Sequence, residues 1–316
     1  METNARNGPG GGNCRYAGSC REPKMEIPDE MAEDNKEKLK SPTQTRRERQ
    51  ARTGVGAGAI RHGSVLGAIR TAAAGPSARK GKPRTYVLVH GAWHGGWVWN
   101  AKGVAAALRA KGHTVTTPTL TGLGERKDNA AAGYDLETHV QDIVDHIEME
   151  NLKDIHLVGW SYGGVVVTGA LARIAERVKS VIYLDAFVPD DGQSLFDYVE
   201  PAARLSLQSS KAINKFVPPN PLSVFGIKDQ ALIEYVQARQ ADQAWQTFFQ
   251  PVKALKVRPN IPHTYIRCTD FVNPSFDAFL EKFKKDPLFT TYELKTSHLA
   301  MMTAPKETIE LLAKAR

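Results

Sequence analysis

A serine between two apolar runs constrains the fold of this chain more than any other stretch. Ile155–Val158 predicts a buried strand, Gly159-Trp160-Ser161-Tyr162-Gly163 a sharp turn, and Val165–Leu171 a buried helix. The glycines on both sides of the serine let the backbones before and after it approach where a Cβ would clash. Gly-x-Ser-x-Gly spacing at a strained strand-to-helix turn is typical of a nucleophile elbow.

Strands and helices alternate on both sides of this turn. Short apolar runs predict further strands at 86–89, 113–117, 178–184, 263–268 and 289–294. Helical patterns are expected at about 99–111, 135–150, 274–285 and from 305. This alternation predicts an α/β fold, with a mainly parallel sheet, helices on both faces and function at the carboxyl ends of the strands.

The region from about 190 to 258 interrupts this alternation. It contains two helical patterns, near 230–240 and 241–249, and a proline-rich connection at 218–221. We interpret this region as a helical cap inserted into a domain that spans 83–316.

The excess positive charge lies entirely in the first part of the chain. The net charge is +8, and residues 1–84 carry 17 Lys/Arg against 9 Asp/Glu, whereas residues 85–316 carry 25 of each. The predicted domain is therefore neutral, and neither nucleic acid nor an anionic membrane is expected as a partner. Residues 1–82 lack a sustained hydrophobic period, so we expect a disordered basic tail or leader of unknown role.

The lengths of the apolar runs and the number of cysteines indicate in which cellular compartment the protein is expected. No run of 18 apolar residues occurs, so we expect no membrane-spanning segment. Cys14, Cys20 and Cys268 do not form a disulfide framework, which favours a reducing, cytoplasmic location. Cys14 and Cys20 also lack a second pair that would complete a zinc site.

A serine hydroxyl needs a base to take its proton, usually an imidazole oriented by a carboxylate. His298, in the loop after the last strand, is the candidate base, because the other downstream histidine, His263, begins a strand. Asp185 and Asp270 each follow the end of a strand, so either could orient the imidazole. The other would then form a cap or turn.

The tetrahedral intermediate of acyl transfer needs two N–H donors directed at its oxyanion. We expect one from Tyr162, directly after the serine, and one from Ala92, in the loop after the first strand. His90 and His94 are not expected to bind zinc, because they lie on a strand and a loop and share no helical face. We therefore expect neither metal nor cofactor.

Four stretches resemble the α/β-hydrolase superfamily, and within it the group of hydroxynitrile lyases and plant methyl salicylate esterases with their bacterial esterase relatives. They are Val87–Trp97, Gly159–Gly164, Ala186–Asp190 and His298–Met301. The resemblance covers about 85–316 and implies the α/β-hydrolase fold, with the catalytic order serine, acid, histidine.

Two departures distinguish the chain from the lyases of that group. The lyases carry threonine where this chain has Gly91, and a lysine directly after the catalytic histidine where it has Leu299. Cyanohydrin cleavage relies on that lysine, so its absence favours ester hydrolysis. Dehalogenases and epoxide hydrolases of similar fold use an aspartate nucleophile, which Ser161 replaces.

A third departure concerns the acid. The plant relatives place it three residues after a cysteine, and that position is Phe271 here, while Asp270 is shifted back by one residue. Such a shift at a strand end directs the side chain to a different face. Asp185 stands where some dehalogenases of this fold carry their acid, and we favour it over Asp270.

The sequence thus predicts a cofactor-free serine carboxylesterase that acts on a small to medium apolar ester or lactone through an acyl-enzyme. The predicted triad is Ser161, His298 and Asp185, and the oxyanion donors are Ala92 and Tyr162. A hydroxynitrile-lyase-type C–C cleavage and a non-catalytic ligand receptor on the same fold are the alternatives. The expected partner is a small-molecule ester, and a homodimer is compatible with the sequence.

Overall fold

The structure is a computed structural model that describes residues 82–315. Residues 1–81 of the tail expected for residues 1–82 therefore lie outside the described residues. The centre of the structure is a six-stranded sheet. The strands are β1 (Thr85–Val89), β2 (Thr114–Thr116), β3 (Ile155–Trp160), β4 (Val178–Leu184), β5 (His263–Cys268) and β6 (Phe289–Leu294). Their order is β2-β1-β3-β4-β5-β6 and every pairing is parallel, which confirms the predicted sheet.

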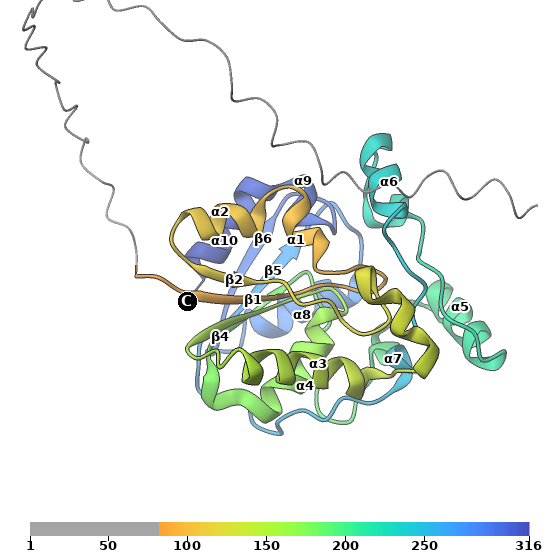
Figure 1. Cartoon of the computed structure of the whole chain (residues 1–316), viewed down its shortest axis with the longest axis horizontal. Coiled ribbons are helices and arrows are strands. Elements are labelled where there is room, and N and C mark those ends of the chain that lie inside the picture. The colour runs from red at the N-terminus through yellow and green to blue at the C-terminus, as the bar shows by residue number, and fades with distance from the viewer. Residues whose placement is uncertain (1–81, 316) are drawn as a thin grey trace, which may run out of the picture. The chain divides into compact units, whose positions relative to one another are not determined.

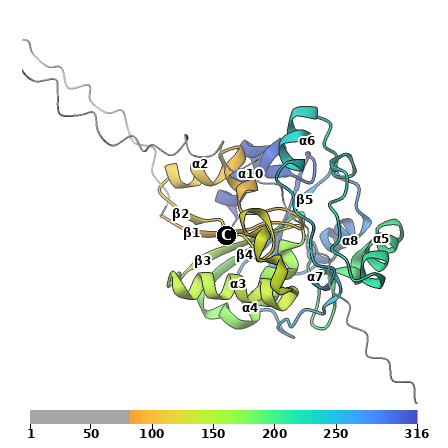
Figure 2. The same ribbon diagram turned by 45° about the vertical axis from the view of Figure 1, so that its right-hand side comes forward.

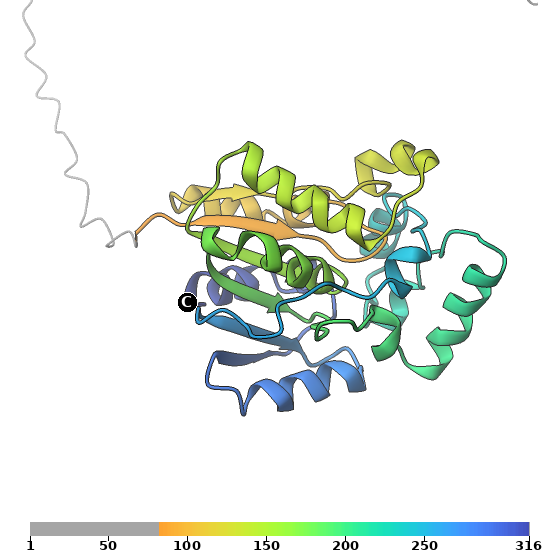
Figure 3. The same ribbon diagram turned by 90° about the horizontal axis from the view of Figure 1, so that it is seen from below.

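Helices cover both faces of this sheet, as the alternating pattern predicted. Figures 1 and 3 show α3 (Leu136–Met149) and α4 (Gly163–Ile174) on one face. On the other face lie α2 (Val104–Ala110) and α10 (Pro305–Lys314), while α8 (Pro274–Phe283) packs against β5 and β6. Strands β3 and β5 are buried along their whole length, because both of their faces are covered.

Two helix starts show how the sequence sets the local structure. The Asp135 side chain accepts a hydrogen bond from the Thr138 amide, and the Thr138 hydroxyl accepts one from the Asp135 amide, which forms a capping box at the start of α3. At α8 the Asn273 side chain accepts from the Phe276 amide, and Pro274 occupies the first turn, where its missing N–H has no cost.

The single helix expected at 99–111 is instead two short helices. α1 (Trp97–Ala101) and α2 are separated at Gly103, whose φ of 77° lies in the left-handed region that glycine adopts readily. The hydrophobic pattern continues across this break, because Trp99, Val104 and Leu108 are all buried. The prediction of one continuous helix was therefore wrong.

The predicted helical cap lies between β4 and β5. It contains η4 (Leu195–Tyr198), α5 (Pro201–Ala212), η5 (Leu222–Phe225), α6 (Gln230–Gln237) and α7 (Gln246–Phe249). Figure 2 shows α5 and α6 set apart from the sheet. Helix α5 was not expected from the sequence, and the exposure of Leu205 (69%) shows why: its apolar residues do not all lie on one face.

The remaining elements are the short helices η2 (Gly124–Ala132), η3 (Ala175–Arg177) and α9 (Ala300–Thr303). Within residues 82–315, no helix combines the length and the apolar character needed to cross a bilayer.

Candidate active site

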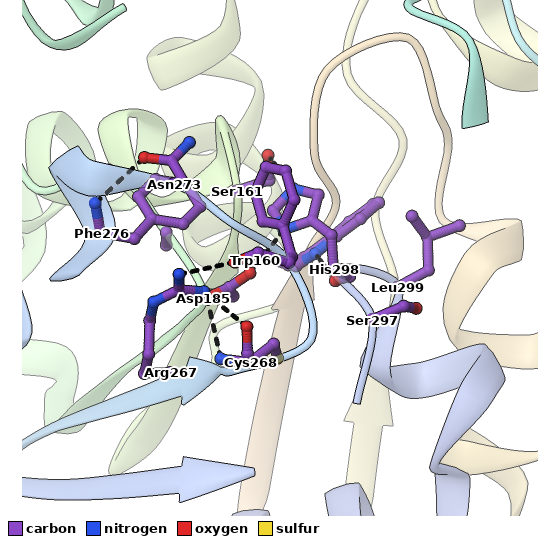
Figure 4. A network of polar contacts seen from close by, with 12 residues as sticks. Trp160, Ser161, Asp185, Arg267, Cys268, Asn273, Phe276, Ser297, His298 and Leu299 are labelled. Atoms are coloured by element: carbon purple, nitrogen blue, oxygen red, sulfur yellow. Dashed lines mark hydrogen bonds and ion pairs between the residues drawn. The ribbon is translucent and has the colours of Figure 1, made fainter. Parts of the chain in front are cut away.

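Three of the predicted residues meet at the carboxyl ends of the strands. Ser161 follows β3, Asp185 follows β4, and His298 lies in the loop after β6. The Ser161 Oγ is 2.8 Å from His298 Nε2, and His298 Nδ1 is 2.7 Å from Asp185 Oδ2 (Figure 4). With its proton on Nδ1, the imidazole donates to the carboxylate and accepts the serine proton at Nε2.

The turn at Ser161 is as tight as an elbow requires. Ser161 has φ = 56°, a left-handed conformation that is strained for a residue with a side chain. A Cβ on Gly163 would lie 2.6 Å from the His90 carbonyl oxygen, and one on Gly159 would lie 2.7 Å from the Gly163 carbonyl oxygen. Only glycine fits these two positions, and the strained turn exposes the serine hydroxyl to the cavity.

The His298 imidazole is fixed by both backbone and rings. The Trp160 indole donates to the His298 carbonyl (2.8 Å), and the His298 amide donates to the Phe225 carbonyl (3.1 Å). The rings of Phe271 and Phe225 pack against the imidazole at centroid distances of 4.6 and 5.2 Å. With 2% of its surface exposed, His298 has few alternative rotamers open to it.

Asp185 is the aspartate that faces this imidazole. It is fully buried, and its backbone adopts φ = 42°, which aspartate tolerates better than most residues. Its Oδ1 accepts from the Arg267 guanidinium and from the Cys268 amide, each at 2.9 Å. Asp270 is exposed and does not contact His298, and its amide donates to the Thr296 carbonyl at 3.0 Å.

Arg267 is a site residue that the sequence analysis missed. Its side chain is 3% exposed, and its Nε donates to Asp277 at 2.8 Å and its Nη2 to the Phe271 carbonyl at 2.6 Å. Burial lowers the pKa of this guanidinium, but Asp185 and Asp277 outweigh burial, so the pKa is raised and the charge persists. The sequence did contain a signal for this role: an arginine inside the predicted buried strand indicates a charged partner, because a buried charge needs one.

The two predicted oxyanion donors line the same cavity as Ser161 and His298. Within the described residues, neither the Ala92 amide nor the Tyr162 amide donates a hydrogen bond to another group. The His90 Nδ1 lies 2.8 Å from the Gly91 carbonyl oxygen. Because that carbonyl and the Ala92 amide share one planar peptide, the hydrogen bond fixes the direction of the N–H.

The cap holds the residue that follows Ala92. Trp93 has φ = 64°, its amide donates to the Gln243 side chain (2.9 Å), and its carbonyl accepts from the Ala241 amide (3.0 Å). Its indole donates to the Val217 carbonyl at 2.9 Å. The oxyanion loop is therefore tied to the cap, a connection between distant segments that the sequence did not reveal.

The Tyr162 side chain is anchored on the opposite side. Its hydroxyl lies 2.8 Å from His139 Nδ1, and His139 Nε2 lies 2.9 Å from the Thr121 carbonyl oxygen. The carbonyl only accepts, so Nε2 carries the proton and Nδ1 accepts from the tyrosine. A neutral His139 thus helps to hold the residue whose amide faces the cavity.

Three imidazoles around this site are kept neutral by burial. Burial lowers the pKa of His90 to about 3, and it lowers those of His94 and His139 to about 4. Hydrogen bonds to the carbonyls of Gly91, Ala92 and Thr121 oppose this effect but do not cancel it. All three side chains therefore serve as fixed hydrogen-bonding groups at neutral pH.

We expect the protein to lose stability in mild acid. The unfolded chain binds protons at these three histidines near pH 6.5, whereas the folded chain resists protonation until about pH 4. Their contribution is complete above pH 6.5 and is lost as the pH falls, by about 2 kcal/mol for each histidine at pH 5. Urea unfolding followed by tryptophan fluorescence from pH 7.5 to 4.5 measures this loss.

A variant of one histidine provides the control for that measurement. In His139→Gln the side chain can still accept from Tyr162 and donate to Thr121, but it no longer titrates. Its unfolding free energy should fall less steeply as the pH is lowered, because unfolding of this variant takes up about one proton fewer than unfolding of the wild type. A flat profile for the wild type between pH 6.5 and 4.5 would contradict the assignment of these histidines as neutral.

Among residues 82–315, no group of three or more His, Cys, Asp or Glu side chains is arranged to hold a metal ion. Cys268 is a free thiol, and burial, followed by the nearby Asp185 charge, raises its pKa well above the usual value. It is therefore unsuited to act as a thiolate nucleophile or ligand.

Residues 86–311 match the model of the alpha/beta hydrolase family. Over 239 residues the chain is 36% identical to the carbendazim hydrolyzing esterase of Nocardioides sp. (strain SG-4G), an alignment that covers 72% of this chain and 98% of that protein. It is 32% identical over 120 residues to methylesterase 1 of Arabidopsis thaliana, covering 34% of this chain and 41% of the relative.

Among solved structures, the chain is similar to an extracellular alpha/beta-hydrolase from a Paenibacillus species, described as sharing structural and functional homology with tobacco salicylic acid binding protein 2. The TM-score is 0.64 at 27% identity, and the match covers 74% of this chain and 99% of the other. These comparisons confirm both the predicted fold and the resemblance to plant methylesterases and bacterial esterases.

Proposed function

The chain belongs to the α/β-hydrolase family, and from this premise we propose that it is a serine carboxylesterase that hydrolyses small to medium apolar esters or lactones. One observation carries the proposal. Ser161, His298 and Asp185 form a continuous hydrogen-bonded chain of 2.8 and 2.7 Å, and its serine end opens into an apolar cavity. That chain supplies a nucleophile, a base and the acid that orients the base.

In the proposed reaction the Ser161 Oγ attacks the ester carbonyl carbon while His298 Nε2 takes the hydroxyl proton. The Ala92 and Tyr162 amides stabilise the negative charge on the carbonyl oxygen. His298 returns the proton to the leaving alcohol as the C–O bond breaks, which leaves an acyl-enzyme on Ser161. A water molecule, deprotonated by the same imidazole, then releases the acid and restores the serine.

The cavity limits the substrate in size and polarity. Its volume is about 180 Å³, and eight aromatic side chains line it together with aliphatic and polar ones. The aromatic residues are Trp93, Tyr162, Phe187, Tyr198, Phe225, Phe248, Phe271 and Phe276. Three aromatic residues of the cap, Tyr198, Phe225 and Phe248, thus line the site, whereas Phe216 is 40% exposed. An apolar acyl or alcohol group of limited length fits such a wall.

The similarity to a carbendazim hydrolyzing esterase suggests one further class of substrate. We propose that a methyl carbamate of an aromatic heterocycle, such as carbendazim, also reacts. Attack on its carbonyl uses the same nucleophile and oxyanion donors, and the aromatic wall can stack on the flat ring.

The space around Gly91 argues against a lyase mechanism at this site. A Cβ on Gly91 would lie 2.9 Å from the Ser161 Cβ and 3.0 Å from the Trp160 ring, so the threonine of the lyases has no room here. Leu299 is fully buried and carries no charge that could stabilise a departing cyanide. Both positions favour hydrolysis.

We expect kcat/KM for p-nitrophenyl esters to rise from acetate to a medium acyl chain such as hexanoate and then to fall sharply for palmitate. Each buried methylene adds about 0.8 kcal/mol of favourable transfer until the cavity is full. A series of initial rates at fixed pH measures the profile. A steady rise up to palmitate would contradict a cavity of this limited volume, and binding of these esters without any hydrolysis would indicate a receptor.

A further inference from the structure

The buried Asp185 carboxylate requires an explanation of its own. It has no exposed surface, and a carboxylate removed from water is strongly destabilised unless it is paired and hydrogen-bonded. Figure 4 shows Asp185 between His298 and Arg267, so one carboxylate group contacts the imidazole and the guanidinium. A neutral His298 cannot compensate the charge, and Arg267 is the cation that contacts it.

The division of contacts between the two oxygens defines the orientation of the carboxylate. Oδ1 accepts from Arg267 Nη1 and from the Cys268 amide, both at 2.9 Å, while Oδ2 faces His298 Nδ1 at 2.7 Å. Two donors from β5 therefore fix one oxygen. Rotation of the carboxylate is restricted, so Oδ2 stays directed at the imidazole.

Arg267 is itself held rigidly, so it can transmit this constraint. Its Nε contacts Asp277 on α8, and its Nη2 donates to the Phe271 carbonyl. The guanidinium thus spans β5, α8 and the loop after β5. Its planar set of donors satisfies several acceptors at once, which a lysine ammonium cannot reproduce in the same geometry.

We propose that Arg267 is the positioning residue of the triad, holding Asp185 charged and oriented so that it can direct His298. This inference rests on the proposed esterase function. The competing explanation is that Arg267 merely clamps the loop after β5 through the Cys268 and Phe271 carbonyls. The two explanations differ in how the effect of Arg267 depends on Asp185.

The first test compares single variants by steady-state kinetics on p-nitrophenyl acetate. Arg267→Met should lower kcat by about 100-fold with little change in KM, because a misdirected base affects the chemical step more than binding. Arg267→Lys should recover about tenfold of this loss, since it restores the charge but not the fork of donors. Asp277→Asn alters only the solvent-exposed partner of Arg267, so its kcat should stay within about threefold of the wild-type value.

The second test is a double-mutant cycle with Asp185→Asn. If Arg267 acts through the carboxylate, then Arg267→Met should change kcat by less than about threefold in the Asp185→Asn background. The same 100-fold loss in both backgrounds would overturn the proposal in favour of a loop clamp. The double variant buries no unpaired charge, so it should fold even if Arg267→Met alone does not.

The third test is the pH profile of kcat/KM. Arg267→Lys keeps a cation beside Asp185 and should keep the wild-type acid limb, whereas Arg267→Met removes that cation and should displace the acid limb. Arg258→Met is the matched control, because Arg258 pairs with Asp190 at 3.2 Å and with Asp286 at 3.9 Å, away from the triad. An acid limb of Arg267→Met that coincides with those of Arg267→Lys, Arg258→Met and the wild type would overturn the proposal.

These outcomes separate the inference from the proposed function. An inactive wild-type protein would refute the esterase proposal, whatever the variants do. An active wild type with an Arg267→Met variant of equal kcat, folded by near-UV circular dichroism, would refute only the role of Arg267.

Discussion

Ser161→Ala is expected to lower kcat for p-nitrophenyl acetate by about 10⁵-fold, the largest effect of any single change in this protein. In the proposed reaction the Ser161 Oγ forms the acyl-enzyme, and the neighbouring imidazole has no other nucleophile to activate in the serine position. Initial rates at saturating ester, corrected for spontaneous hydrolysis, measure the loss. The remaining rate would come from the oxyanion donors and from binding alone.

The matched control is a serine of the cap. Ser209 is exposed on α5, and its hydroxyl donates to the Leu205 carbonyl of its own helix at 2.8 Å. Ser209→Ala should therefore keep the wild-type rate. Equal hydrolysis by wild type and Ser161→Ala would end the esterase proposal, because the reaction would then not depend on the elbow serine.

Asp185→Asn is expected to lower kcat by about 10⁴-fold, whereas Asp270→Asn should leave it within about threefold. A carboxamide directs its N–H₂ or its weaker oxygen toward His298, so the imidazole loses both the partner that selects its tautomer and the charge that stabilises its protonated form. Asp270 is exposed and does not contact the imidazole, so its change reaches no reacting group.

Folding must be checked alongside this comparison. The Asp185 side chain is the buried partner of Arg267, and its loss leaves a guanidinium without its main counter-charge. Thermal unfolding of both variants shows whether a low rate reflects chemistry or a smaller folded fraction. A large loss in Asp270→Asn together with normal kcat in Asp185→Asn would show that the acid has been assigned to the wrong strand.

The parts of the site that lie close together in the sequence were predictable from local rules. The elbow needs only a buried strand, small residues and a buried helix in succession, and 155–171 contains all three. The position of Ala92 after β1 follows in the same way. The positions of β4, β5 and β6 were also predictable, since each strand is a short run rich in β-branched and aromatic residues.

The cap was harder to predict, because the conformation of its residues depends on contacts with segments elsewhere in the chain. Gln243 is fully buried and donates to Thr247 while it accepts from the Trp93 amide, a polar role that no periodicity reveals. Helix α5 keeps an exposed Leu205 beside a buried Leu207, so its hydrophobic pattern is weak. Tertiary contacts decide the conformation in both cases.

The sequence by itself determined that a serine, a histidine and two aspartates would reach one edge of a parallel sheet, because strand ends converge there whatever the details of packing. It did not decide which aspartate faces His298. That depends on the pairing of β4 with β5, which places Leu184 beside Ile266 and so brings Asp185 next to Arg267 and Cys268 while Asp270 lies exposed. Orientation and charge compensation are properties of contacts between strands far apart in the chain, so only the tertiary structure could decide them.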